Sequence, residues 1–366
     1  KKVSAAIDRL LASDRYPETV QPEYLRTAVL DYPQNGGKRL RPAILIWCCR
    51  LLGGKESAAL YPAAASEVFH NWTLVHDDII DQDTVRRNRP TCHVALANEA
   101  RSRFGLESET AARTGRDFAI LAGDLQQGWA NHLMLRAAEH GVSAKVTVGV
   151  MRRFQELANR ELICGEALDV EFALRHLETI GLDEVREMLR GKTGALLRFC
   201  AEAGAMIALE TDDPETPEVR KLGDFADAAG IAFQLRDDYL GIFGKVEQLG
   251  KAIGGDLREG KATILLLTAL RMASGHERQR LLRLLGHREY THHDLDAVRK
   301  IMIDCGAAAA IETEETELAD RAKAILKEFP ANVYRKCLLE LVDYLITREK
   351  RSEEHTSELQ SRSDLV

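Results

Sequence analysis

The sequence predicts an all-α fold. Strong helix formers (Ala, Leu, Glu and Arg) dominate the composition, and only 9 of the 366 residues are proline. Runs of β-branched residues with a period of two are scarce, so few strands are expected. Hydrophobic residues make up 45% of the chain, which is ample for a core. Length alone allows one large domain or two smaller ones, and we expect a single domain over residues 1–351.

Charge and cysteine usage exclude several classes of protein. The formal net charge is −7 and no basic tract dominates, which argues against a nucleic-acid-binding protein. The arginines cluster locally, which suits a small anionic ligand. The 7 cysteines form no CxxC pair, and Cys48 and Cys49 lie in an apolar run where core packing is expected. A reduced, cytoplasmic compartment fits this pattern.

Membrane and secretion signals are not expected in this chain. Its first four residues, Lys1-Lys2-Val3-Ser4, lack the apolar stretch of a signal peptide. No segment approaches 18 consecutive apolar residues, so no transmembrane helix is predicted. The polar tail, residues 352–366, has no apolar period and is expected to be disordered. It resembles a translated sequencing adapter and is expected not to belong to the native protein.

Apolar residues at helical spacing place most of the elements. The helices are expected, in chain order, over residues 1–30, 63–80, 100–140, 145–175, 183–210, 264–273, 276–300 and 305–350. Within 100–140, a turn is predicted at Gly115. The long helix at 63–80 is expected to end near Asn88-Arg89-Pro90, because proline disfavours helix in the residue before it.

A glycine-rich basic loop, Asn35 to Pro42, precedes the second helical region. Its two consecutive glycines free the backbone to turn, and Pro42 suits the start of a helix. Such a start exposes unpaired N–H groups beside Lys38, Arg39 and Arg41, which favours binding of an anion. The alternative is a basic loop in solvent.

Three carboxylates, Asp77, Asp78 and Asp81, gather at the end of the long helix. Asp77 and Asp81 are four residues apart and share one helix face, where like charges repel by about a few tenths of a kcal/mol. Folding therefore gives no reason for this cluster, whereas Mg²⁺ does, since it prefers hard oxygen ligands together with substrate phosphates. The alternative is an exposed acidic helix end followed by a basic turn.

Basic and aromatic side chains surround these carboxylates in the sequence. Arg86 and Arg87 follow shortly and could bind the same phosphates as bidentate donors. His70 lies two helical turns before Asp77 on nearly the same face, which favours a role facing phosphate. A lone histidine is otherwise more often a packed core or surface residue.

The second half of the chain repeats the acidic theme. Phe233–Gly241 places the pair Asp237 and Asp238 on an apolar helical segment, 160 positions after the first pair. Two such pairs could face each other across a cavity and bind one metal diphosphate from both sides. An exposed acidic patch would not require this repetition.

Two further segments carry lysines between glycines. Gly191-Lys192-Thr193-Gly194 interrupts a helical pattern, and each glycine weakens a helix by about 1 kcal/mol. That cost predicts a kink or a close approach to a ligand, with Lys192 and Thr193 directed inward. Residues 251–263, which include Lys251 and Lys261, suggest a phosphate-covering loop. They do not match the Walker A pattern, because GxxxxGK[ST] is absent.

With GGKRLRP, DDIID followed by RR, KT and FQLRDDYLG in this order, the chain resembles the trans-isoprenyl diphosphate synthases of the farnesyl and geranylgeranyl type. The likeness covers residues 20–350. It implies a bundle of ten or more helices around a deep central cavity, usually in a homodimer. It implies Mg²⁺ as the cofactor, with three ions per active site. The metal ligands that it implies are Asp77, Asp81 and Asp237, supported by Asp78 and Asp238.

The resemblance also implies the substrates, isopentenyl diphosphate and an allylic diphosphate, and the residues that contact them. The residues implied for the allylic diphosphate are Arg86, Lys192, Lys251 and Lys261. Those implied for isopentenyl diphosphate are Lys38, Arg41, His70 and Arg87. Thr193 and Gln234 are implied to direct their oxygens at the developing carbocation. With Lys192 they form the implied catalytic residues. Loss of diphosphate, attack by the double bond and loss of a proton would then add five carbons.

Two positions depart from the family pattern. Gly241 stands where many members have a third Asp in the second motif, and activity is expected to survive because the metal role rests on Asp237. Glu166 replaces a common glutamine, while Asp169 is kept. A carboxylate at position 166 could alter contacts with metal or diphosphate.

Product length is expected to depend on residues below the first acidic cluster. By resemblance, Thr73 and Trp72 set the floor for the growing chain, with Phe69 one turn further down. The bulk of Trp72 predicts short products, C15 to C20. Helix geometry leaves another possibility: Trp72 is rotated away from the face of Asp77 and could pack laterally, leaving a longer channel.

Four alternatives remain at this point. A longer-chain polyprenyl diphosphate synthase would differ in its product only. A class I terpene cyclase would normally lack the basic GGKRLRP pocket and the second acidic pair. A non-catalytic partner subunit of a heteromeric synthase would be expected to lose Asp or Arg ligands, which this chain keeps. A merely structural helical protein leaves the clustered like charges unexplained.

Overall fold

The computed structural model describes residues 2–244, 257, 260–285 and 291–348. Within them the all-α prediction is confirmed, and the α-helices exceed the ten that were predicted. The sheet of the described region is a single antiparallel pair, β1 (Val85–Arg86) with β2 (Arg89–Pro90). In this part of the chain, no helix combines the length and apolar character needed to cross a lipid bilayer.

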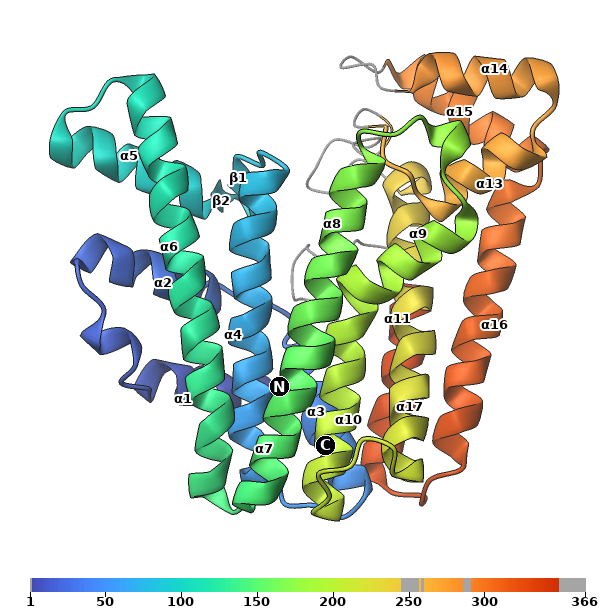
Figure 1. The fold of residues 1–366 in the computed structure, drawn as a ribbon. Coiled ribbons are helices and arrows are strands. Elements are labelled where there is room, and N and C mark those ends of the chain that lie inside the picture. The colour runs from blue at the N-terminus through green and yellow to red at the C-terminus, as the bar shows by residue number, and fades with distance from the viewer. Residues whose placement is uncertain (1, 245–256, 258–259, 286–290, 349–366) are drawn as a thin grey trace. The chain divides into compact units, whose positions relative to one another are not determined.

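The described residues pack as two compact units, whose elements are labelled in Figure 1. The first unit comprises Lys1–Met151 and Met206–Asp213. The second comprises Arg152–Ala205 and the described residues from Pro214 onward. A single domain over residues 1–351 stays a prediction, and the tail at 352–366 lies outside the described residues.

The first unit is built on two long helices that run side by side, α4 and α6 (Figure 1). Its helical elements are α1 (Lys2–Ser13), η1 (Pro17–Thr19), α2 (Glu23–Gln34), α3 (Leu40–Leu51), α4 (Glu56–Ile80), α5 (Cys92–Phe104), α6 (Ser108–Leu135), η2 (Arg136–His140) and most of α7 (Ala144–Arg153). Helix α3 packs on α4, and α5 packs on α6. Phe69 and Trp129 are fully buried in this core.

Helix α4 ends earlier than the sequence predicts. The helix stops at Ile80, not near Pro90, and Asp81 caps it by donating its N–H to the Asp77 carbonyl at 2.8 Å. The chain then reverses through β1 and β2. Arg87 and Asn88, which connect them, both take positive φ angles of 52° and 60°. Gln82, two residues past the helix, also has a positive φ of 57°, so the chain leaves the helical path well before Pro90.

The turn predicted at Gly115 is wrong, because α6 continues through this residue. A Cβ at Gly115 would lie 2.4 Å from the His93 carbonyl oxygen and 2.6 Å from the Ala97 nitrogen of α5. The glycine thus permits two helices to pack closely and does not break one. Helix propensity reflects only the local free-energy cost of glycine, and the close packing of α5 on α6 offsets that cost.

The second unit is organised around α11, which packs along α16. Its elements are η3 (Phe154–Glu161), α8 (Leu162–Phe172), η4 (Leu177–Thr179), α9 (Leu182–Leu189), η5 (Arg190–Gly194), α10 (Ala195–Leu209, whose last turn belongs to the first unit), α11 (Pro217–Phe243), α13 (Ile264–Met272), α14 (Gly275–Leu284), α15 (His292–Asp304), α16 (Ala307–Lys327) and α17 (Val333–Thr347). Val185, Leu235, Ile264 and Val298 belong to its apolar core.

Two segments of the chain contain π-helical turns. The helix predicted over 145–175 runs through α7, η3 and α8, and the one over 183–210 runs through α9, η5 and α10. The segment η5 coincides with the Gly191–Gly194 interruption of the helical pattern. Single π-turns inside α-helices frequently mark functional sites.

Candidate active site

In the first unit, the glycine-rich loop is shaped by positive φ angles before α3. Gly36 and Gly37 have φ of 93° and 127°, and Arg39 follows at 49°. Arg39 is buried and donates to Glu67 Oε1 at 2.6 Å and to Asp8 Oδ1 at 2.9 Å. This basic residue therefore anchors the loop. Its neighbours Lys38 and Arg41, the two predicted to bind substrate, are half-buried.

Arg87 ties the β1–β2 turn to the glycine-rich loop. Its Nη1 donates to the Gly36 carbonyl oxygen at 3.0 Å. Left-handed backbone is unfavourable for a side chain of this size, so its positive φ marks a locally strained position of the kind that clusters at functional sites. The contact joins two sequence motifs, around positions 36 and 87, that the chain separates by about fifty residues.

His70 lies among the basic residues of both motifs. Burial lowers the pKa of His70 well below its usual range, and the charges of Arg41, Arg87, Arg86 and Arg39 lower it further. The imidazole is therefore neutral at physiological pH. A neutral histidine near several guanidinium groups adds a hydrogen-bonding group to a cationic cluster. Such a cluster suits an anion with several oxygens, such as a diphosphate.

The three carboxylates of the first acidic cluster lie in different environments. Asp78 is fully buried and accepts hydrogen bonds from the Tyr32 hydroxyl and from Arg86 Nε, the latter at 2.8 Å. Arg86 Nη2 lies 3.6 Å from Asp77 Oδ2, and the Asp77 side chain is 23% exposed. Asp81 is exposed. Asp78 thus holds Arg86 in place, while Asp77 and Asp81 are the more accessible pair.

Tyr32 is a site residue that the motifs did not identify. Its hydroxyl also accepts a hydrogen bond from the Cys92 backbone N–H at 3.1 Å, and burial raises its pKa far above the ordinary value, helped by the negative charge of Asp78. The phenol therefore stays a donor. Tyr32 lies 46 residues before Asp78, and no sequence signal pairs the two.

The predicted chain-length residues lie on α4. Phe69 is fully buried, Trp72 is 7% exposed, and their ring centroids are 4.7 Å apart. A Cβ at Gly123 of α6 would lie 3.2 Å from Trp72 Cδ1, so Trp72 packs against α6, as the lateral alternative anticipated. Thr73 is half-buried, and its hydroxyl donates to the His70 carbonyl at 2.7 Å.

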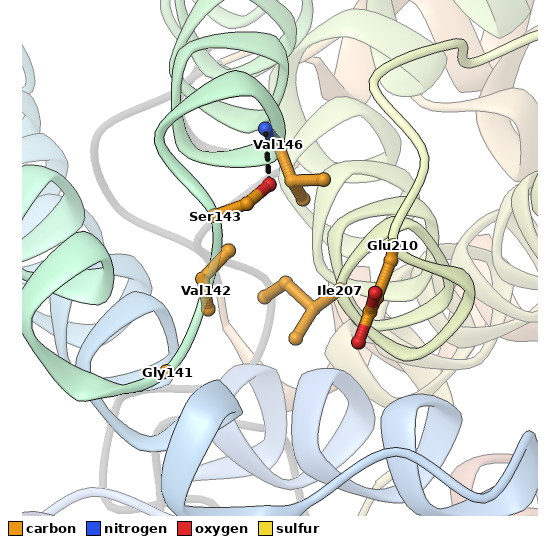
Figure 2. Close-up of a pocket in the computed structure, with 6 residues that line it drawn as sticks. All are labelled: Gly141, Val142, Ser143, Val146, Ile207 and Glu210. Carbon is orange, nitrogen blue, oxygen red and sulfur yellow. Dashed lines mark hydrogen bonds between the residues drawn. The ribbon is translucent and has the colours of Figure 1, made fainter.

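A cavity of about 350 Å³ lies elsewhere in the first unit. Figure 2 shows its six lining residues, which include Ser143, Ile207 and Glu210. The Ser143 hydroxyl accepts the Val146 N–H at 3.3 Å and so serves the start of α7. No residue that the motifs single out lines this cavity, and it is not the candidate site.

In the second unit, the second acidic pair joins the lysine-threonine segment through hydrogen bonds. The Thr193 hydroxyl donates to Gln234 Oε1 at 3.2 Å, and Gln234 Nε2 donates to Asp238 Oδ1 at 3.0 Å. Asp237 Oδ1 pairs with Arg348 Nη2 at 2.8 Å. The structure therefore brings Thr193, Gln234 and Asp238 together.

Arg348 is another site residue that no sequence motif indicates. It follows α17, 111 positions after Asp237, and its side chain is only 1% exposed. One nitrogen, Nη2, also donates to the Phe233 carbonyl at 2.9 Å, and the guanidinium stacks 4.0 Å from the Phe233 ring centre. The end of the last described helix thus supports the second acidic motif.

Lys192 lies between two carboxylates of α8. Its Nζ is 2.6 Å from Asp169 Oδ2 and 2.9 Å from Glu166 Oε2. Lys261 Nζ lies 3.5 Å from the same Asp169 oxygen. Burial would raise the pKa of Asp169, but the charges of Lys261 and Lys192 outweigh burial and leave it lowered. Lys251, the remaining predicted lysine, lies outside the described residues.

The carboxylates in each unit have the chemistry that Mg²⁺ requires. Asp77 and Asp81 in the first unit, and Asp237 in the second, offer hard oxygen donors. Within the described ranges, no three histidine, cysteine, aspartate or glutamate side chains converge to hold an ion by themselves. Such a donor set fits Mg²⁺, which typically uses one or two carboxylates and completes its shell with water and substrate phosphate.

Comparison with known proteins identifies the family. Residues 22–302 match the profile of the polyprenyl synthetase family. A geranylfarnesyl diphosphate synthase from Aeropyrum pernix is 35% identical over 91% of this chain and 96% of its own length. A geranylgeranyl pyrophosphate synthetase structure from Pyrococcus horikoshii is 30% identical, with a TM-score of 0.81 over 95% of this chain and 97% of that one.

A further structural relative was solved with ligands. It is a geranylgeranyl pyrophosphate synthase from Corynebacterium glutamicum in complex with isoprenyl diphosphate and magnesium. It is 26% identical and covers 95% of this chain and 98% of that one, with a TM-score of 0.81. The matched profile spans most of the chain and includes both acidic motifs. This chain belongs to the polyprenyl synthetase family.

Proposed function

We propose that this protein is a Mg²⁺-dependent trans-prenyltransferase. It condenses isopentenyl diphosphate with an allylic diphosphate and forms a short-chain trans-prenyl diphosphate of C15 to C20, with geranylgeranyl diphosphate favoured. The observation that carries this proposal is the group of arginines near His70, which Arg86 links to Asp77 at 3.6 Å and to Asp78 at 2.7 Å. Guanidinium groups around a neutral imidazole suit a diphosphate, and carboxylates beside them suit its metal ions.

We propose that the aspartates of the two acidic motifs hold the metal ions. Asp77 and Asp81 would provide the ligands of the first motif and Asp237 those of the second, with Asp78 and Asp238 in support and three ions in each active site. When bound, Mg²⁺ neutralises charge on the departing diphosphate. Asp78 orients Arg86, which lies 2.7 Å from it. Arg348 pairs with Asp237 and would hold that carboxylate in place.

The substrates are proposed to occupy separate groups of basic residues. Those assigned to isopentenyl diphosphate are Lys38, Arg41, His70 and Arg87. Those assigned to the allylic diphosphate are Arg86, Lys192, Lys251 and Lys261. The contact between Arg87 and the Gly36 carbonyl supports the first group, because it fixes the two motifs of that pocket side by side.

The chain's own residues then guide three bond changes. The basic groups and the metal-binding carboxylates favour heterolysis of the allylic C–O bond, whose electron pair leaves with the diphosphate. The hydrogen-bonded pair Thr193 and Gln234 presents oxygen atoms to the allylic cation. The double bond of isopentenyl diphosphate attacks this cation, and a proton leaves the adjacent carbon. No residue of these motifs is an obvious base, so the departing diphosphate is assigned to take that proton.

Product length is proposed to be limited by Thr73, Trp72 and Phe69. The tight packing of Phe69 and Trp72 supports a rigid wall on this side of α4. Trp72 packs against α6 and against Phe69. It would therefore limit product length both directly and by fixing the position of Phe69. The favoured product remains C20 or shorter.

The protein is also proposed to act as a cytoplasmic homodimer with no nucleic-acid partner. In the described part of the chain, α6 exposes large apolar side chains, with Leu121 50% and Leu135 52% exposed. Apolar residues of this size on a long helix suit a subunit interface. Free cysteines that include the buried Cys48, Cys49 and Cys92 are consistent with a reducing compartment.

One assay tests the proposed function. The purified protein is incubated with isopentenyl diphosphate, Mg²⁺ and each allylic diphosphate in turn, and the products are sized after removal of phosphate. We expect C15 to C20 alcohols and one diphosphate released per condensation. Asp77→Asn should lower the rate by at least about a hundredfold, whereas Asp83→Asn, a nearby carboxylate outside the proposed ligands, should leave it within about twofold.

Other products would support the competing assignments. A cyclase would release a hydrocarbon from the allylic diphosphate without isopentenyl diphosphate. A longer-chain synthase would give products beyond C20. A non-catalytic partner subunit would be inactive alone although folded, and this result would overturn the proposal.

A further inference from the structure

Glu166 gives Lys192 a second carboxylate partner. Lys192 Nζ lies 2.9 Å from Glu166 Oε2 and 2.6 Å from Asp169 Oδ2. The side chains of Lys192 and Glu166 are only 21% and 19% exposed, so water screens their interaction less than it would at the surface. By the family resemblance, glutamine is common at position 166, and in this chain a carboxylate takes its place.

Two glycines permit this contact, because without a Cβ the backbones of α8 and η5 can lie close together. A Cβ at Gly165 would lie 2.2 Å from the Lys192 nitrogen, and a Cβ at Gly191 would lie 3.0 Å from the Gly165 Cα. Glu166 follows the first glycine and Lys192 follows the second. The close backbone approach thus determines that these two side chains meet.

The two carboxylate partners of Lys192 differ in their other contacts. Asp169 is shared with Lys261, which lies 3.5 Å away. Glu166 adds a further negative charge beside Lys192, in a place where the proposed function requires that ammonium group to hold the allylic diphosphate. A diphosphate oxygen and the Glu166 carboxylate would therefore compete for the same donor group.

We propose that Glu166 is a positioning residue that holds Lys192 against α8 and weakens its hold on diphosphate. This inference rests on the proposed function and specifies how tightly the site keeps its diphosphate. With glutamine at position 166, Lys192 would keep Asp169 as its charged partner. It would lose one ion pair fewer when it binds a diphosphate, so binding would be more favourable. The carboxylate therefore raises the KM for the allylic substrate and speeds release of the diphosphate product.

The first test measures binding directly and needs no turnover. Inorganic diphosphate is titrated calorimetrically into the full chain in the presence of EDTA. We expect Glu166→Gln to bind about three- to tenfold more tightly than the unaltered protein, the range for loss of one partly buried ion pair. Glu166→Asp, which keeps the charge, should stay within about twofold. Glu171→Gln removes a charge from the same helix at a residue that pairs with Arg175 instead, and should also stay within about twofold.

The second test separates KM from kcat. For Glu166→Gln, the KM for the allylic diphosphate should fall by the same factor as the dissociation constant, while kcat stays equal or falls. Equal binding by Glu166→Gln and the unaltered protein would overturn the inference. An equal gain in Glu171→Gln would also overturn it, because the effect would then be one of net charge.

A role for Glu166 as a metal ligand would give a different pattern. Glu166→Gln would then need more Mg²⁺ for half-maximal rate and would show no gain in metal-free diphosphate binding, which would overturn the inference. Failure of the proposed function is seen separately, as absence of any prenyl product from the unaltered protein. The metal-free titration gives its answer in either case.

Discussion

Replacing Gly165 by alanine tests whether the close approach of α8 and η5 is as tight as the structure indicates. The added Cβ would lie 2.2 Å from the Lys192 nitrogen, 2.7 Å from the Gly191 carbonyl carbon and 2.9 Å from the Met188 carbonyl oxygen. All three atoms are backbone, so no flexible side chain can move aside. The two segments must separate by about an ångström to restore ordinary contact distances.

The magnitude follows from two opposing terms. Overpacking of this kind costs about 3 kcal/mol, the upper part of its usual range, because the clash is with backbone. Alanine in place of glycine inside a helix returns about 1 kcal/mol. We therefore expect Gly165→Ala to lower the free energy of unfolding by about 2 kcal/mol. It should also lower prenyltransferase activity, since Lys192 moves with the η5 backbone.

Gly194 provides a matched control within the same π-helical segment. A Cβ there would meet nothing closer than 3.8 Å, which is ordinary van der Waals contact. Gly194→Ala should therefore raise the free energy of unfolding by about 0.5–1 kcal/mol. The two variants should differ by about 3 kcal/mol in urea denaturation monitored by circular dichroism, at unchanged m-value. Equal stability of Gly165→Ala and Gly194→Ala would refute the packing argument.

Three further predictions concern the first unit. Tyr32→Phe leaves the buried oxygen of Asp78 and the Cys92 N–H without this partner and should cost about 1–3 kcal/mol of unfolding free energy. Because the pKa of His70 is lowered by burial and by neighbouring arginines, the unfolded state binds its proton more readily. Stability should thus be lost as pH falls below about 6.5, at up to about 1.4 kcal/mol per pH unit, and His70→Gln should lessen that loss. Trp72→Ala should cost about 3–5 kcal/mol and lengthen the products beyond C20.

Each of these has a control. Tyr24→Phe, on the same helix as Tyr32, should change the unfolding free energy by less than about 0.5 kcal/mol, because the structure shows ring contacts there. An identical acid dependence of stability in His70→Gln and the unaltered protein would contradict the neutral state of His70. Products of unchanged length from a folded Trp72→Ala protein would remove Trp72 from the chain-length residues.

Helical identity was predictable from the sequence because it depends on local periodicity. The apolar spacing and the paucity of proline predicted helix over much of the described chain, although some bounds differ, as at the end of α4. The ordered motifs led to the family. Carboxylates and arginines that folding alone cannot explain marked the candidate site. These signals are local, so a single sequence carries them.

Prediction failed where a residue's local cost is compensated by a distant contact. Gly115 was expected to turn the chain, yet it admits α5 against α6. Arg39 was one of several basic residues in a loop, and only folding showed that Glu67 and Asp8 hold it in the interior. Propensity and spacing describe one segment at a time and contain no information on such partners.

The sequence by itself determined the fold class, the family and the types of side chain that do the chemistry. Only the tertiary structure decided which partners each of these side chains has. Asp78 pairs with Tyr32 and Arg86. Asp237 pairs with Arg348, and Lys192 pairs with Glu166 and Asp169. The reason is physical. The chemistry of a side chain belongs to the residue, whereas its charge partners and its burial depend on segments that lie far away in the chain and meet only when it folds.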